Sequence, residues 1–294
     1  MGETLVFGLV AGGIYGLFAV GIVLVYRGSG VINFAQGEIG TFSLFLAWYL
    51  ITDRGHPWLL GAAAAVLLAA AIGWGFERVV VRPMIDASKV AVAVATVGLL
   101  GFLLALELRL FTASPRGIGG PIQGLGVRVA GVYVSPTQML SLVVTLAVGL
   151  SLAALLKRTD FGLGVLAAAE DPIAVRLVGV PLSRVSGFIW SAGAAVAALA
   201  ALLIEPTVGV FVPGFASELF LRGLAAAVVG GLKSLPGAFL GGLVVGIIEA
   251  GSGKWFGGLN LPGVQVLSVF VLILLVLLFR PQGVLSRQLR GVPA

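Results

Sequence analysis

Asn33, Gln36 and Glu38 bring two amides and a carboxylate into one short segment between two long apolar stretches. Gly30 and Gly37 in the same segment allow the backbone to leave regular helical geometry. Polar side chains beside broken helix ends, near the middle of a membrane, are a common way to build a transport site. The segment therefore predicts a substrate pathway or gate at these three residues. A plain turn fits equally well, with Asn33 capping the next helix and Gln36 at its third position.

Other charged residues within apolar stretches have simpler explanations. Glu107 and Arg109 lie near the end of a stretch, where long side chains reach the membrane interface. Glu218 and Arg222 are one helical turn apart and can neutralise each other. The remaining carboxylates of this kind are Glu205 and Glu249. Together they form no chain that resembles a proton relay, so interface or paired positions are favoured over a proton pathway.

The sequence offers little for catalysis. The single histidine, His56, precedes Pro57 in a short loop, and the absence of cysteine excludes disulfides and thiolate metal sites. The run 251–255 has a Gly-Lys pair but lacks the first glycine of a phosphate loop and carries Trp255 where Ser or Thr would bind magnesium. We expect no enzyme activity, no metal site and no cofactor bound by this chain itself.

Composition places the chain in a membrane. Hydrophobic residues make up 59% of it, charged residues only 10%, and the mean hydropathy is +1.14, whereas about 25% of a soluble domain is charged. The 44 glycines suit close helix packing in lipid. The high isoelectric point does not indicate nucleic-acid binding, because the cations are scattered between apolar stretches, where orientation signals lie.

Apolar stretches of nearly 20 residues predict an all-α, polytopic membrane protein with eight to ten hydrophobic segments, in a single transmembrane domain over residues 1–294. The second, seventh and eighth stretches are short and glycine-rich, which predicts re-entrant or broken helices. No cleavage site of small residues follows the first, so we expect a retained helix. The candidate stretches are 4–26, 35–51, 59–77, 90–111, 136–156, 187–210, 216–232, 236–251 and 263–279.

The distribution of Lys and Arg predicts the orientation. If the polar interval at about 157–186 is cytoplasmic, most cations between the stretches are cytoplasmic too. The opposite side then holds only Arg54, Arg116, Arg128 and Lys254. Because cytoplasmic loops carry an excess of Lys and Arg, this places the N-terminus outside and the C-terminus inside, with nine crossings.

The polar interval itself looks structured. Gly162 and Gly164 precede a helix-forming run, Asp171 can cap a second helix with Pro172 at its first position, and Gly179 can close that helix. Two short helices on a cytoplasmic loop predict a docking element, although a solvated connector remains an alternative.

Glycines spaced four residues apart indicate close helix crossings, within the chain or between subunits. These glycines are Gly8, Gly12 and Gly16 in the first stretch and Gly237, Gly241, Gly242 and Gly246 near the C-terminal end.

Four motifs, in order along nearly the whole chain, resemble the permeases of branched-chain amino acid ABC importers. They are Val31-Ile32-Asn33-Phe34-Ala35-Gln36-Gly37-Glu38; Ala167-Ala168-Ala169-Glu170-Asp171, followed by Gly179-Val180; the glycine block 230–242; and Phe279-Arg280-Pro281-Gln282-Gly283. Gln36 stands where the family pattern leads us to expect His. This departure leaves the substrate open, because close relatives carry urea, short amides or other amino acids.

The resemblance implies a bacterial inner-membrane complex with ATP bound by partner subunits. Two permease chains, either two copies or a copy with a sister chain, would join two cytoplasmic ATPases and an extracytoplasmic substrate-binding protein. The chain would form the pathway for leucine, isoleucine, valine or related small substrates. The expected ATPase-docking residues are Ala168, Glu170, Asp171 and Gly179.

Two other classes of function remain as alternatives. An ion- or proton-coupled secondary transporter of small solutes needs irreplaceable carboxylates at the membrane midplane. An intramembrane enzyme needs a nucleophile and a base, and His56 in an outside loop argues against it.

Overall fold

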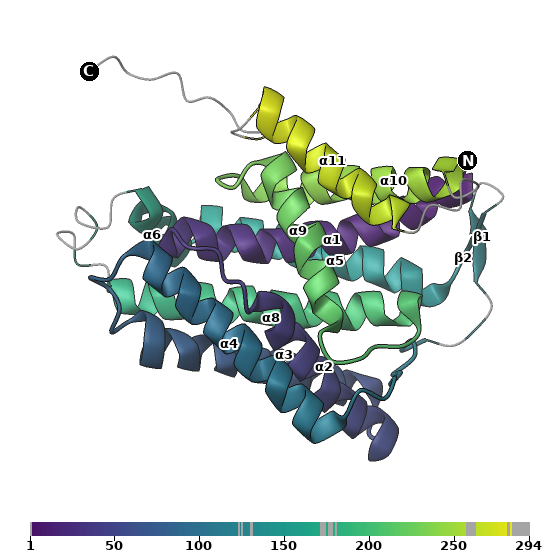
Figure 1. The fold of residues 1–294 in the computed structure, drawn as a ribbon, viewed down its shortest axis with the longest axis horizontal. Helices are drawn as coiled ribbons and strands as arrows, with labels where there is room; N and C mark the ends of the chain where they lie inside the picture. The colour runs from purple at the N-terminus through teal and green to yellow at the C-terminus, as the bar shows by residue number, and fades with distance from the viewer. Residues whose placement is uncertain are drawn as a thin grey trace.

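The computed structural model describes residues 2–122, 124, 126–129, 132–170, 175, 179, 181–256, 263–280 and 283, without the side chains of residues 129, 169 and 170. This part of the chain is mostly helical and carries one small hairpin (Figure 1). The helices are α1 (Gly2–Ser29), α2 (Gln36–Trp48), α3 (Trp58–Phe76), α4 (Lys89–Phe111), α5 (Pro136–Arg158), α6 (Asp160–Glu170), α8 (Leu182–Val208), α9 (Phe215–Gly230), α10 (Leu235–Phe256) and α11 (Val264–Phe279). The hairpin pairs β1 (Val127–Val129) with β2 (Val132–Val134) in antiparallel register.

Each of the nine apolar stretches corresponds to a helix, which confirms the predicted class of fold. Six described helices are long and apolar enough to cross a membrane. Two π-helical segments, whose turns are wider, continue the helices α2 and α3. They are Tyr49–Asp53 after α2 and Glu77–Val81 after α3. The expectation of a short or broken eighth stretch is wrong, because α10 continues through Gly251–Lys254 and is 22 residues long.

Helix α1 forms the centre of the molecule and packs along α10 (Figure 1). Glycines make this approach possible: a Cβ on Gly12 would lie 2.8 Å from the Gly242 carbonyl oxygen, and one on Gly8 would lie 2.9 Å from the Ile247 Cα. Gly241 instead faces α9, where a Cβ would overlap the Ala226 carbonyl oxygen. The glycines of α10 therefore serve two faces, one against α1 and the other against α9.

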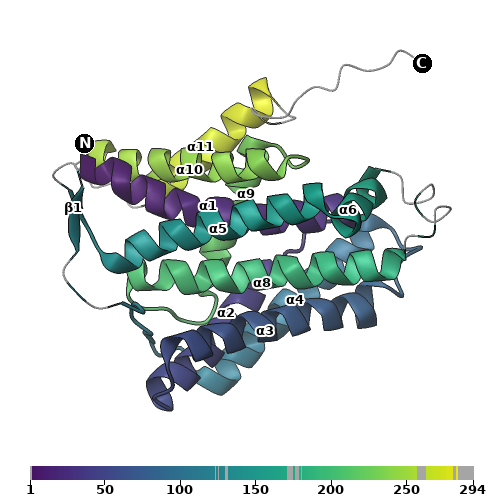
Figure 2. The same ribbon diagram turned by 180° about the vertical axis from the view of Figure 1, so that it is seen from behind.

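Two helices begin inside the bundle. After α1 ends, residues 30–35 run back, and α2 begins beside Phe18, near the middle of α1. After α8 ends at the opposite end of the bundle, residues 209–214 run back, and α9 begins against α2 (Figures 1 and 2). The second and seventh stretches are thus preceded by segments that fold back into the bundle, while their re-entrance into a membrane stays a prediction.

The two ends of the bundle carry different elements. The start of α1 and the β1–β2 hairpin lie at one end, and a Cβ on Gly2 would lie 2.9 Å from a Val132 side-chain atom. Helix α6 lies at the other end, toward which α11 runs (Figure 2). The two ends of the bundle thus carry the same two groups of loops that the distribution of Lys and Arg separates. Which end faces the cytoplasm stays a prediction.

Helix α6 begins earlier than expected. It starts at Asp160 and includes both glycines, whereas the sequence suggested a start after them. The reason is local: the Thr159 hydroxyl accepts a hydrogen bond from the Gly162 N–H at 3.0 Å. Gly162 also lies against the backbone of Leu156 at the end of α5, where a Cβ would not fit.

The second short helix predicted for this interval lies mostly outside the described residues. Asp171 and the side chain of Glu170 belong to that part. Gly179 is described and has a φ of +82°, the left-handed conformation that a helix-closing glycine adopts.

Candidate functional site

Asn33 shapes the turn that leads into α2. Its Oδ1 accepts a hydrogen bond from the Ala35 N–H at 3.1 Å, and the Phe34 N–H donates to Thr96 of α4 at 3.1 Å. Helix α2 starts at Gln36, after Ala35 at the N-cap position. The alternative in which Asn33 is the N-cap, with Gln36 in the third position, is therefore wrong, because a further turn separates Asn33 from the helix.

The three predicted pathway residues lie together but face inward. Asn33 is 1% exposed, and Gln36 and Glu38 are 0% exposed. The Gln36 amide donates a long hydrogen bond, 3.5 Å, to the Phe18 carbonyl oxygen in the middle of α1. Within the described residues, Asn33 Nδ2, Gln36 Oε1 and Glu38 Oε2 have no hydrogen-bond partner. These side chains thus hold helix ends in place within one chain and do not line an open cavity.

The start of α9 explains why polar groups gather here. The first N–H groups of a helix lack partners within the helix, and in a membrane water does not supply them. The Gly214 N–H donates to the Glu107 carboxylate at 3.1 Å, and the Ala216 N–H donates to the Thr41 hydroxyl at 2.9 Å. Helix α9 is therefore capped by side chains from α4 and α2.

Glu38 joins the same capped end. Its carboxylate accepts a hydrogen bond from the Ser217 hydroxyl in the first turn of α9, and it faces the carboxyl group of Glu107. Carboxylates are favoured beside a helix N-terminus because of the helix dipole. We call Asn33, Gln36, Glu38, Thr41, Glu107 and Ser217 the crossing cluster.

Glu107 and Glu205 are buried inside the bundle and do not lie at a membrane interface. Glu107 is 0% exposed, so the expectation that it reaches the membrane interface is wrong. Glu205 is 1% exposed and accepts a hydrogen bond from the Ile118 N–H at 2.9 Å. Both bind backbone N–H groups more than 80 residues away in the sequence. No local pattern in the sequence could have indicated these partners.

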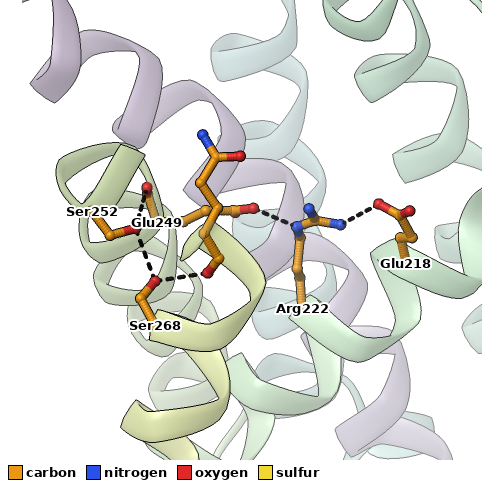
Figure 3. A network of polar contacts seen from close by, with 6 residues as sticks. Glu218, Arg222, Glu249, Ser252 and Ser268 are labelled. Carbon is orange, nitrogen blue, oxygen red and sulfur yellow. Dashed lines mark hydrogen bonds and ion pairs between the residues drawn. The ribbon is translucent and has the colours of Figure 1, made fainter. Parts of the chain in front are cut away.

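A second polar group, the ion-pair network, joins α9 to α10 (Figure 3). Arg222 Nε lies 2.7 Å from Glu249 Oε1, and Arg222 Nη1 lies 3.1 Å from Glu218 Oε2. The guanidinium also lies over the ring of Tyr15, 5.8 Å from its centroid. Spacing alone predicted the pair of Glu218 with Arg222, while the third member, Glu249, is brought in by the packing of α10.

The ion-pair network borders a cavity of about 500 Å³ between α1, α8 and the first turns of α9. Its polar wall consists of Tyr15, Thr207, Glu218 and Arg222, and its apolar wall includes Ile204 and Leu219. This is within the size range of small-molecule sites, which is about 300–1,000 Å³. Sequence reasoning did not select these residues as a site, because Thr207 and Tyr15 carry no local signal.

A third feature lies at the end of the bundle that carries α6. Arg82 pairs with the buried carboxylate of Glu77 at 2.7 Å and also donates to the Ser183 carbonyl oxygen at 3.1 Å. This ties the loop between α3 and α4 to the start of α8. A cleft of about 630 Å³ lies beside these contacts, and the predicted docking residue Ala168 lines it. Among the described residues, no group of three potential metal ligands occurs.

The arrangement defines a class of protein: a polytopic helical membrane protein with helices that begin inside the bundle and a polar cavity beside one of them. A family model described as "Branched-chain amino acid transport system / permease component" matches residues 4–279. The chain belongs to this family of transport permeases, which confirms the resemblance found in its motifs.

Individual relatives agree over almost the whole chain. The chain is 34% identical to the high-affinity branched-chain amino acid transport system permease protein BraD of Pseudomonas aeruginosa, over 97% of this chain and 95% of the relative. It is 32% identical to the corresponding permease LivH of Escherichia coli K12, over 95% and 94%.

A solved structure, PsaBC from Streptococcus pneumoniae in complex with Fab, matches with a TM-score of 0.53 and 15% identity, over 96% of this chain and 92% of that one. At this identity the match shows a shared fold alone.

Proposed function

We propose that this chain forms the translocation pathway for branched-chain amino acids, as the permease subunit of an ABC importer driven by a separate ATPase. The observation that carries the proposal is the match to this permease family over residues 4–279, together with the similarity to two named branched-chain amino acid permeases. The proposed partners are cytoplasmic ATP-binding subunits, a second permease chain and an extracytoplasmic substrate-binding protein.

The decisive experiment purifies the chain with its partner subunits and measures leucine uptake into proteoliposomes. We expect uptake that requires ATP on the ATPase side and leucine-loaded binding protein on the other. The alternative, ion- or proton-coupled transport, predicts uptake driven by an ion gradient without ATP, and that result would refute the proposal. Competition by valine, isoleucine, urea and short amides then defines the substrate.

The crossing cluster is proposed as part of the gate. Its side chains are buried, apart from that of the half-buried Ser217, so they would act by fixing the starts of α2 and α9, and substrate would not need to touch them. The close contact of the two helices supports this: a Cβ on Gly37 would lie 2.7 Å from the Ala216 carbonyl oxygen. Closely packed helices transmit a displacement as rigid elements.

The interval containing α6 is proposed as the ATPase-docking element, with Ala168, Glu170, Asp171 and Gly179 in the contact. Gly179→Val places a β-branched residue at a φ of +82°, which strains the turn. We expect this variant to lose substrate-stimulated ATP hydrolysis and co-purification of the ATPase while still inserting in the membrane. Gly55→Val is the matched control, since Gly55 also has a positive φ and open space around it but lies in a different loop. Normal coupling in Gly179→Val would refute this assignment.

The orientation is testable because the chain has no cysteine. We propose that the N-terminus is outside and the C-terminus is cytoplasmic, on the evidence of the Lys and Arg distribution. Ser183→Cys should react with a membrane-impermeant reagent only after cells are opened, whereas Ser114→Cys, in a loop at the other end, should react in intact cells. The reverse pattern would invert the topology.

A further inference from the structure

The ion-pair network that borders the cavity beside α9 holds an unequal number of opposite charges. The guanidinium of Arg222 lies between two carboxylates, those of Glu218 and Glu249. The side chain of Glu249 is only 10% exposed and lies closer to the guanidinium, so it forms the inner partner. The side chain of Glu218 is 75% exposed. One guanidinium between two carboxylates leaves one negative charge, and the exposed carboxylate carries it toward the open side.

The position of this charge restricts what it can face. Helix α9 begins inside the bundle, and Arg222 lies over Tyr15, which is halfway along α1. An ionised carboxylate at such depth is strongly disfavoured against lipid tails and requires water, a counter-charge or a polar ligand. Arg222 is a single counter-charge shared by two carboxylates, so the side of α9 that carries Glu218 needs an aqueous space, a further counter-charge or a ligand.

The Arg222 guanidinium also has N–H donors left with which it can bind an anionic group. Glu249 and Glu218 engage Nε and Nη1 of Arg222, which leaves further N–H donors of the five that a guanidinium carries. The cavity thus offers a carboxylate for a cation and a guanidinium for an anion on the same helix face. Ile204 and Leu219 also line the cavity and provide apolar surface.

We infer that this cavity is a transient binding site for the zwitterionic head group of the transported amino acid, with Glu218 receiving the α-ammonium group and Arg222 the α-carboxylate. The branched side chain lies against the apolar wall. Glu249 is a positioning residue, which holds the Arg222 side chain from behind. This inference rests on the proposed function, since it names the groups that would recognise its substrate.

Charge-selective labelling tests the cavity without relying on transport. Thr207→Cys introduces a single thiol into the cavity wall of a chain that has no other cysteine. In the assembled transport complex we expect a cationic methanethiosulfonate reagent to react faster than an anionic one of similar size. Adding Glu218→Gln should lower the ratio of the two rates about tenfold, because it removes the surplus negative charge at short range. The same substitution should leave the ratio at Ser114→Cys unchanged.

Protection by ligand tests the head-group assignment. Millimolar leucine should slow the labelling of Thr207→Cys several-fold, and isoamylamine, which keeps the ammonium but lacks the carboxylate, should protect more weakly. Protection by either compound should be lost with Glu218→Gln. The variant should fold as the wild type does, because the side chain of Glu218 is 75% exposed. A Thr207→Cys thiol that is inaccessible in the complex, an unchanged rate ratio, or an absence of protection would each overturn the inference.

These results separate the two proposals. If wild-type proteoliposomes take up leucine with ATP but Glu218→Gln alters neither the labelling ratio nor protection, only the head-group site fails. If no ATP-dependent leucine uptake occurs in the wild type, the proposed function fails, whatever the charge selectivity of the cavity.

Discussion

The carboxylates in the first turns of α2 and α9 have opposite surroundings, although the two helices begin side by side inside the bundle. Asn33, Gln36 and Glu38 of the first are at most 1% exposed, while the side chain of Glu218 in the first turn of the second is 75% exposed. Buried groups in the crossing cluster form hydrogen bonds to backbone groups or to other side chains of the cluster, and so hold the helix starts in place. The exposed carboxylate bonds to Arg222 but retains room for another partner. Burial therefore separates a structural polar group from one that can meet a ligand.

The largest expected effect is a loss of stability when Arg222 is removed from the ion-pair network, because Glu249 is the buried partner and Glu218 the exposed one. Arg222→Met leaves the buried carboxylate of Glu249 without its counter-charge, which should destabilise the protein by about 3–5 kcal/mol. The double variant Arg222→Met/Glu249→Met removes both charges and should recover most of that loss. Thermal unfolding of the purified chain in detergent measures both. Equal losses in the single and double variants would contradict the inner role of Glu249.

Glu38→Leu should have the next largest effect, through the crossing cluster. It leaves the Ser217 hydroxyl without its acceptor and Glu107 without a neighbour, and a buried group left unpaired costs about 1–3 kcal/mol. Leucine uptake should fall sharply at unchanged expression and ATPase assembly, as should uptake in Asn33→Leu. Glu218→Gln is the matched control for stability and should unfold within about 0.5 kcal/mol of the wild type, as an exposed substitution does. Wild-type uptake in both leucine variants would reduce the segment to an ordinary turn.

Gln36→His is expected to have the smallest effect. Its amide makes one long hydrogen bond to the Phe18 carbonyl oxygen, and an imidazole N–H can donate to the same acceptor. The motif resemblance also leads us to expect histidine at this position. Uptake should therefore stay closer to the wild type than in Glu38→Leu, which transport assays of the two variants in parallel will show. A loss as large as that of Glu38→Leu would assign Gln36 a role beyond this bond.

The sequence predicted the membrane class, the nine apolar helices and the family. These follow from composition, from the length of apolar stretches and from motif order, all of which are local properties. It also predicted that Asn33, Gln36 and Glu38 lie together, because they are neighbours in the chain. The start of α6 and the length of α10 were predicted wrongly, since single hydrogen bonds and side-chain contacts decide where a helix begins or ends.

Only the tertiary structure decided which polar groups are buried and which partners they bind. Glu107 accepts a hydrogen bond from the Gly214 N–H, and Arg222 pairs with Glu249. The partners of each pair are far apart in the sequence, and no periodic pattern links them. The sequence determined that these charges lie within apolar stretches, where each requires a partner. It could not determine which partner, because the crossing of helices distant in the chain sets whether a carboxylate caps a buried helix end or lines a cavity.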